Sequence, residues 1–272
     1  MCPWSILAVF RRGSALALLA GLLSAQTALR CPPGTTRTRQ SFDGGYVISC
    51  KVPGGVLQGP YVEYEGAQKA REGEYRDGKQ EGAWTTFYPN GHKESVIHYR
   101  SGEEYGPWTR WGPNGNKREE GEYEGRWTVE PQGEVEAKPV GQYTAWYDDG
   151  HLKMQGRYSG GMRDGTWTDW YANGQKSAES LFFAGTRTGL WTTWYENGQK
   201  ASEQAFRDGK EDGTRVVWSP SGTKTAEESY RAGVRDGPWM WWDDKGQLSR
   251  VQQWENGRMV KSLDYRNGKP IN

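Results

Sequence analysis

The sequence predicts an all-β chain, folded as an elongated single-layer array of about eight antiparallel β-hairpin repeats of 24 residues. Two observations support this prediction: a sequence pattern that recurs with that period, and a composition of 38 Gly, 15 Trp and 15 Tyr in 272 residues. Only 34% of the residues are hydrophobic. We therefore expect aromatic rings stacked over short strands in place of an aliphatic core.

The repeat is clearest in two neighbouring segments. Residues 165–176 read Gly-Thr-Trp-Thr-Asp-Trp-Tyr-Ala-Asn-Gly-Gln-Lys, and residues 189–200 read Gly-Leu-Trp-Thr-Thr-Trp-Tyr-Glu-Asn-Gly-Gln-Lys. Repeats of this length indicate arrays in which each unit packs only on its neighbours. The glycines that open the eight units are Gly59, Gly82, Gly106, Gly141, Gly165, Gly189, Gly213 and Gly237.

Each unit contains the turn and strand residues of a β-hairpin. In four units the turn glycine follows Asn, as in Asn173 and Gly174, and in others it follows Asp, Ser or Lys. Asn-Gly tolerates the positive φ angles of a tight hairpin turn. The residues before it are aromatic and Thr-rich, which is typical of strands. Because alternate side chains point to opposite faces, Trp167 and Trp170 are expected on opposite faces. A second glycine, such as Gly233, links one hairpin to the next.

The sequence divides into four parts. Residues 1–28 are predicted to be a signal peptide, 29–58 an N-terminal segment, 59–268 the repeat array and 269–272 a tail. The array carries an insert at 126–140, because the spacing from Gly106 to Gly141 is 35 residues.

The N-terminus has the pattern of an export signal. Arg11 and Arg12 precede an apolar run over 15–23, which is followed by the small residues Ala25 and Ala28. The run is shorter than the ~20 residues of a membrane-spanning helix. We expect an exported protein, located in the periplasm or cell envelope or secreted. An uncleaved anchor remains the alternative.

The cysteines are consistent with export. Cys2 lies in the predicted signal, so Cys31 and Cys50 form one remaining pair. In an oxidising compartment a disulfide between them is the preferred interpretation, and two free thiols are the alternative.

The recurring pattern Gly-x-Trp-x-x-Trp-Tyr-x-Asn-Gly-Gln-Lys, followed by an aromatic residue three before a glycine, resembles the MORN-repeat variant family over about residues 59–268. The chain is similar to a bacterial, exported member. The resemblance implies an elongated, curved sheet of hairpins that serves as an interaction or scaffold surface. Some similar bacterial proteins are labelled as antitoxins of toxin–antitoxin pairs, a role that an export signal fits poorly.

No catalytic, cofactor or metal site is predicted. His92 and His151 occupy the position after the turn glycine that Gln175 and Gln199 fill in other units, so we interpret them as turn residues. The carboxylates recur with the repeat, whereas a catalytic pair would stand out from it. A net charge of +1 argues against nucleic acid as a partner. We expect no enzymatic activity, no cofactor and no small-molecule substrate.

The candidate binding surface consists of repeated aromatic and basic side chains. The main hypothesis is a protein–protein interaction or scaffold surface outside the cytoplasm, with an unknown protein partner. The alternatives are an envelope-binding module that contacts anionic lipid or glycan, and an antitoxin-like partner of a toxin. The recurrent lysines have a simpler interpretation as charges that blunt exposed strands and are offset by nearby Glu. The candidate residues are Trp167, Trp170, Trp191, Trp194, Lys176, Lys200 and Lys224.

Overall fold

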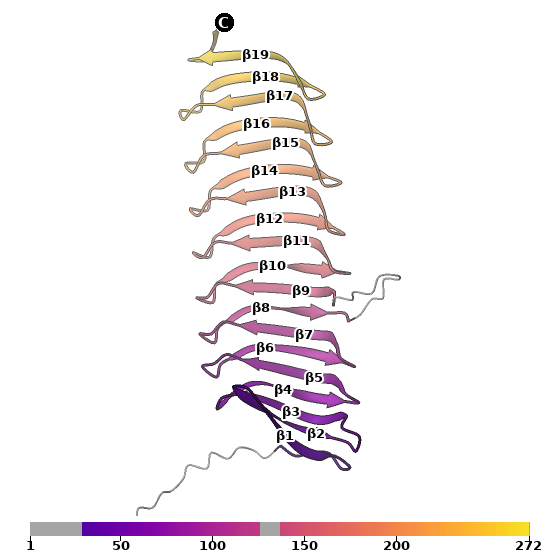
Figure 1. Cartoon of the computed structure of the whole chain (residues 1–272). Helices are drawn as coiled ribbons and strands as arrows, with labels where there is room; N and C mark the ends of the chain where they lie inside the picture. The colour runs from indigo at the N-terminus through magenta and orange to yellow at the C-terminus, as the bar shows by residue number, and fades with distance from the viewer. Residues whose placement is uncertain (1–28, 126–136, 272) are drawn as a thin grey trace, which may run out of the picture.

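The computed structural model describes residues 29–125 and 137–271, which form one antiparallel sheet (Figure 1). Each strand pairs with the next one along the chain, from β1 with β2 to β19 with β20. The sheet is open, because β1 and β20 lie at opposite ends of it. In the described ranges no helix is long and apolar enough to cross a membrane.

The described residues form twenty strands. They are β1 Thr36–Phe42, β2 Gly45–Lys51, β3 Leu57–Glu65, β4 Gln68–Arg76, β5 Lys79–Phe87, β6 Lys93–Arg100, β7 Glu103–Trp111, β8 Lys117–Tyr123, β9 Pro139–Trp146, β10 Leu152–Ser159, β11 Met162–Trp170, β12 Lys176–Phe183, β13 Thr186–Trp194, β14 Lys200–Arg207, β15 Lys210–Trp218, β16 Lys224–Arg231, β17 Val234–Trp242, β18 Leu248–Glu255, β19 Arg258–Arg266 and β20 Lys269–Ile271.

The predicted all-β hairpin array is confirmed. The eight predicted units are the hairpins from β3–β4 to β17–β18, and each has its opening glycine in its first strand. Two further hairpins extend the sheet, β1–β2 at one end and β19–β20 at the other, so about ten hairpins are present. The predicted signal at 1–28 and residues 126–136 of the predicted insert lie outside the described residues, and Pro139 already belongs to β9.

The opening glycine of each unit marks a β-bulge. At Gly165 φ is 75°, and the register between β10 and β11 shifts between Gln155 and Arg157. Only glycine adopts positive φ at little cost, which explains why this position repeats as Gly. All eight opening glycines have positive φ: Gly59, Gly82, Gly106, Gly141, Gly165, Gly189, Gly213 and Gly237.

The Asn-Gly turn differs from the tight turn expected there. Gly174 has a φ of 81° but Asn173 has no positive φ, whereas the turn with two successive positive φ angles lies at the linking glycine, as in Asp208 and Gly209. Asn173 acts through its side chain. Its Oδ1 accepts a hydrogen bond of 2.9 Å from the Gln175 amide, and its Nδ2 donates one of 2.8 Å to the Glu196 carbonyl of the next unit.

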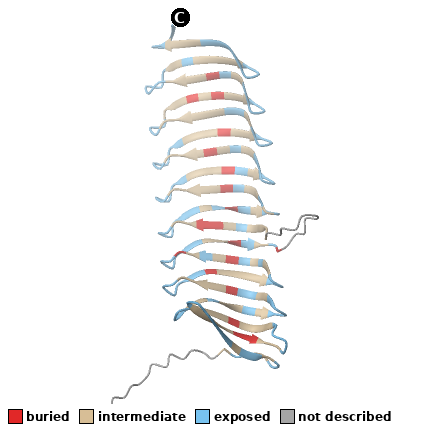
Figure 2. Ribbon diagram, viewed as in Figure 1, coloured by how far each residue is buried: buried red, intermediate tan, exposed pale blue. Residues whose placement is uncertain are grey.

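The core is a row of rings that runs across the strands. Trp167 has 0% of its surface exposed, and its ring centroid lies 4.9 Å from that of Tyr158 and 5.8 Å from that of Tyr143. Gly156 lies beneath the indole, where a Cβ would collide with it. Figure 2 shows the buried residues as a column along the middle of the strands. Each ring packs on its neighbours, as expected for a linear array.

Candidate interaction surfaces

One broad surface of the sheet carries the buried ring row, and we call it the ring face. Four of its tryptophans donate their Nε1 hydrogen to a backbone carbonyl of the preceding strand, as Trp167 does to Arg157 at 3.1 Å and Trp191 does to Leu181 at 3.2 Å. Within the described residues, the buried Nε1 of Trp108 has no hydrogen-bond partner. Five of these rings are buried in the core, and Tyr143 and Trp191 are partly exposed, so the row does not form an open platform. The row consists of Tyr61, Trp84, Trp108, Tyr143, Trp167, Trp191 and Trp239.

Arginines cover part of the ring face. The guanidinium of Arg163 lies 4.2 Å from the ring centroid of Trp167, and that of Arg187 lies 4.6 Å from that of Trp191. A cation over a ring face is attracted by its quadrupole, by ~0.5–1 kcal/mol at exposed sites. The polar groups that lie over Trp167 and Trp191 on this face are therefore arginine guanidinium groups.

The opposite surface of the sheet is the lysine face. Thr168 follows Trp167 and pairs with Glu179, which places Glu179 on the side opposite Trp167. Lys176 forms an ion pair of 2.6 Å with Glu179, and its Nζ lies 5.9 Å from the ring of Trp194. The structure thus separates the candidate tryptophans, with Trp167 and Trp191 on the ring face. The rings that repeat with the unit on the lysine face are Phe87, Trp111, Trp146, Trp170, Trp194, Trp218 and Trp242.

The candidate lysines are all engaged within the sheet. Lys176, Lys200 and Lys224 each bind the glutamate three residues later, and each also lies over a ring of the next unit. Such half-exposed ion pairs contribute only ~0–1 kcal/mol to stability. They nevertheless neutralise the charge of the column that these lysines form across the strands. Lys93 and Lys153 lack this glutamate partner, because Val96 and Gln155 occupy the equivalent positions in their units.

Arg215 interrupts the ring row at the position that Trp191 and Trp239 hold in adjacent units. Its Nη1 lies 3.2 Å from the carboxylate of Glu228, which is only 9% exposed and also accepts a hydrogen bond from the Tyr230 hydroxyl. Burial, and then the charge of Glu228, raise the pKa of Tyr230 to about 12. Sequence reasoning did not single out this buried polar group.

A shallow hollow of about 480 Å³ lies where the insert interrupts the period. Four of its polar groups are paired with one another: Arg118 binds Asp148 at 3.0 Å, and the hydroxyl of Tyr143 donates to Glu119 at 3.2 Å. Burial, and then the charge of Glu119, raise the pKa of Tyr143 to about 12. Across 29–125 and 137–271, no group of three or more His, Cys, Asp or Glu side chains could hold a metal ion.

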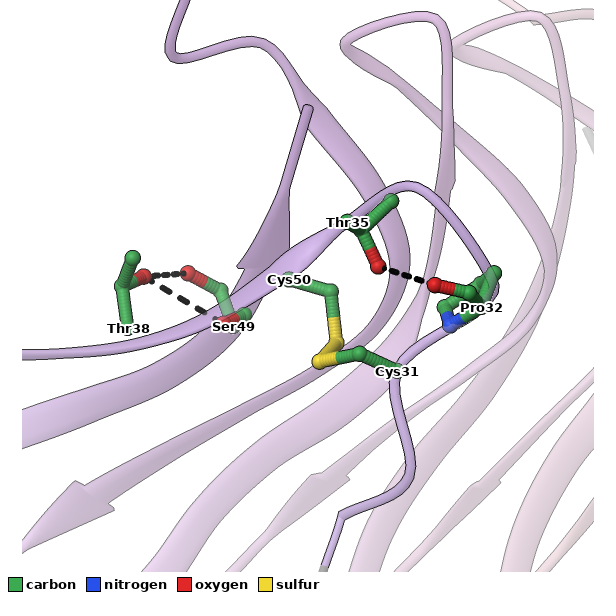
Figure 3. The surroundings of a disulfide bond; sticks show 6 residues. All are labelled: Cys31, Pro32, Thr35, Thr38, Ser49 and Cys50. Atoms are coloured by element: carbon green, nitrogen blue, oxygen red, sulfur yellow. Dashed lines mark hydrogen bonds between the residues drawn. A yellow bond between two sulfur atoms is a disulfide. The ribbon is translucent and has the colours of Figure 1, made fainter. Parts of the chain in front are cut away.

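The two candidate cysteines form a disulfide (Figure 3). It joins Cys31, which precedes β1, to Cys50 in β2, and the two Cα atoms are 5.5 Å apart. The hydroxyl of Thr35 donates a 2.7 Å hydrogen bond to the carbonyl of Pro32, and that of Thr38 lies 3.0 Å from the hydroxyl of Ser49. This cross-link fastens the N-terminal hairpin.

A second feature that sequence reasoning missed is an exposed apolar patch in the middle of the array. Its side chains lie on three consecutive strands, β11 to β13. The signal for it is a departure from the repeat, since neighbouring units carry mostly small or polar residues at these positions. The apolar patch consists of Met162, Leu181, Phe183 and Leu190.

Comparison with known proteins agrees with the repeat geometry. The MORN repeat variant family matches residues 80–101, 163–183 and 187–208, and each match covers most of one hairpin: β5–β6, β11–β12 and β13–β14. No curated protein matches the chain.

Proposed function

We propose, from the premise that this chain is a MORN-variant β-hairpin repeat protein, that it acts without catalysis as a protein–protein interaction or scaffold surface outside the cytoplasm. The observation that carries this proposal is that the side chains shared by the units are used in holding neighbouring units together. Side chains that differ between units are left to recognise a partner.

The shared tyrosine shows this use most clearly. The hydroxyl of Tyr171 donates a hydrogen bond of 2.7 Å to the backbone carbonyl of Trp194 in the next unit. Equivalent bonds join Tyr147 to Trp170 and Tyr195 to Trp218. Because linear arrays are stabilised by nearest-neighbour contacts, repeated residues of this kind support the scaffold. The result is a long surface with two accessible faces.

The location outside the cytoplasm is supported by two features. The N-terminal residues have the pattern of an export signal, and the Cys31–Cys50 disulfide is of the kind that persists in oxidising compartments. A fusion of residues 1–28 to a reporter that is active only after export tests this part. Reporter activity is expected, and its loss when Arg11 and Arg12 are replaced by Glu would agree with a signal. A reporter that stays inactive would contradict export.

The interaction itself is tested by a pull-down from envelope and secreted fractions, with the chain from residue 29 onward as bait and washes at low and high salt. We expect one protein to be recovered at both salt concentrations. Recovery of lipid or glycan alone would contradict the proposal.

The alternative of an anionic lipid surface is less well supported, because the lysine column is paired with glutamate. Replacing Lys176, Lys200 and Lys224 by Glu is therefore expected to change vesicle binding little. A loss of binding to anionic vesicles in this variant, together with loss at high salt, would favour the lipid alternative.

A further inference from the structure

The apolar patch is a contiguous surface on the lysine face. Phe183 is 73% exposed, Leu190 54%, Met162 48% and Leu181 36%. Leu181 and Phe183 are two apart on β12 and share a face, and Leu181 lies against Gly189, beside Leu190 on β13. Met162 on β11 lies beside Gly185 in the turn after Phe183, because a Cβ added at Gly185 would be 3.4 Å from the Cβ of Met162.

The patch is not part of what holds the array together. At the positions equivalent to Leu181, the two adjacent units carry Arg157 and Ala205. At the positions equivalent to Phe183 they carry Ser159 and Arg207, and Thr166 stands where Leu190 does. The sheet therefore forms with small or polar residues at these places. Exposed apolar clusters with a polar rim are typical of interaction sites.

Two exposed arginines lie beside the patch, whereas the nearby carboxylate of Glu179 is paired with Lys176. Arg157 occupies the position equivalent to Leu181 in the preceding unit and is exposed, and Arg207 occupies the position equivalent to Phe183 in the following unit. Each arginine is therefore two strands, or about 10 Å, from the equivalent patch residue. The side chain of Arg207 is 76% exposed and its partner Asp212 only 19%. Asp164 accepts a hydrogen bond from the Ala184 amide of the turn. A complementary partner carries negative charge at its edges.

The area of the patch is consistent with a short peptide segment as its partner. Four partly exposed side chains offer at most a few hundred Å², whereas a stable interface buries about 800 Å² on each partner. A second copy docked through this patch alone would be too weakly held. A segment with two or three large apolar residues is of matching size.

We propose that the apolar patch binds a short amphipathic segment of another protein, in which bulky apolar residues are flanked by Asp or Glu. This inference rests on the proposed interaction function and names the chemistry of the partner and its place on the array.

The test uses the chain from residue 29 onward and a patch variant, Leu181→Ala, Phe183→Ser and Leu190→Thr. Each new residue stands at the equivalent position of an adjacent unit, so the variant is expected to fold. The probe is a fluorescent synthetic peptide that alternates Leu or Phe with Glu. One comparison peptide has Lys in place of Glu, and another has Ser in place of Leu and Phe.

We expect the acidic apolar peptide to bind, and the patch variant and both comparison peptides to bind about tenfold or more weakly. Met259→Ser with Val260→Thr in β19, another exposed apolar pair, is the matched control and should leave binding unchanged. Equal binding by the patch variant, equal binding of the basic peptide, or a loss of the same size in the control would overturn the inference. A dimer in sedimentation that the patch variant abolishes would show a second copy as the occupant.

Failure of this inference is distinguishable from failure of the proposed function. If the patch variant recovers the same protein in the pull-down as the unaltered chain, the interaction function stands and the assignment to the patch is wrong. If neither bait recovers a protein, the proposed function itself fails.

Discussion

The hydroxyl of Tyr171 donates a 2.7 Å hydrogen bond to the backbone carbonyl of Trp194, 23 residues along the chain. This bond crosses from one repeat unit to the next at the Asn-Gly end of the hairpins. Asn173 reinforces it with a bond of 2.8 Å to the carbonyl of Glu196. The Tyr-x-Asn-Gly segment therefore joins neighbouring units as well as turning the chain.

Removing this hydroxyl should weaken one junction without changing the fold. We expect Tyr171→Phe to lower the free energy of unfolding by about 0.5–1.5 kcal/mol, because the Trp194 carbonyl loses its partner. Hydrogen exchange of β11 to β14 and chemical denaturation provide the measurement. Tyr105→Phe is the control, since within the described residues that hydroxyl makes no hydrogen bond. An equal loss of stability in both variants would contradict the role of this bond.

The close packing of Trp167 on Gly156 gives a second prediction. A Cβ at residue 156 would collide with the indole, so Gly156→Ala should destabilise the array by about 1–3 kcal/mol. Trp167→Leu should cost about 3 kcal/mol, mainly through the cavity that it leaves. With Leu at 167, the added methyl has room, and Gly156→Ala should then cost much less.

A double-mutant cycle measures this coupling. Ser180→Ala, at the equivalent position under Trp191, removes only a hydroxyl and is the matched control. If the two substitutions at 156 and 167 prove additive, the collision is not the cause of the destabilisation.

Much of the fold follows from the sequence because the period reports it directly. Glycines that need positive φ and rings that pack on neighbours must recur at the same place in every unit, as Gly165 and Trp167 do. The alternation of Trp167 and Trp170 likewise predicts their separation onto two faces. Segments outside the period gave no such signal, so the continuation of the sheet by β1 and β2 was not predicted.

The candidate surface was predictable only in part. The lysine column was visible in the sequence, and so was its offset by glutamate, because both recur. The apolar patch was not identified, because Leu181 and Leu190 look like isolated variations until the register places them on neighbouring strands. The role of Arg215 was not predicted for the same reason. Its significance depends on Glu228, which is 13 residues away and directly opposite it.

Tyr230 predicts how stability depends on pH. Its pKa is raised to about 12 by burial and by Glu228, whereas an unfolded tyrosine ionises near pH ~10. The folded chain therefore retains a proton that the unfolded chain loses. The stability from this group is fully present below pH ~10 and is lost as pH rises towards the folded pKa.

Chemical denaturation across this alkaline range should show a falling free energy of unfolding. Tyr230→Phe should make the decline less steep, and Tyr143→Phe should act in the same direction, because the pKa of Tyr143 is also raised to about 12. Phenolate absorbance checks the cause independently. Titration of all tyrosines at the same pH in the folded and unfolded chain would refute the prediction.

Reduction of the Cys31–Cys50 disulfide should loosen the N-terminal hairpin. The cross-link spans 19 residues, and in the chain-entropy account a loop of this length stabilises by about 3 kcal/mol. The effect should be local, because units of a linear array are coupled only to their neighbours. We expect faster hydrogen exchange in β1 and β2 after reduction, with little change beyond the first units. In a Cys31→Ser, Cys50→Ser variant the exchange should already be fast, and reductant should change nothing. If the unreduced chain reacts with a thiol reagent at both cysteines after unfolding, the disulfide is absent and the two residues are free thiols.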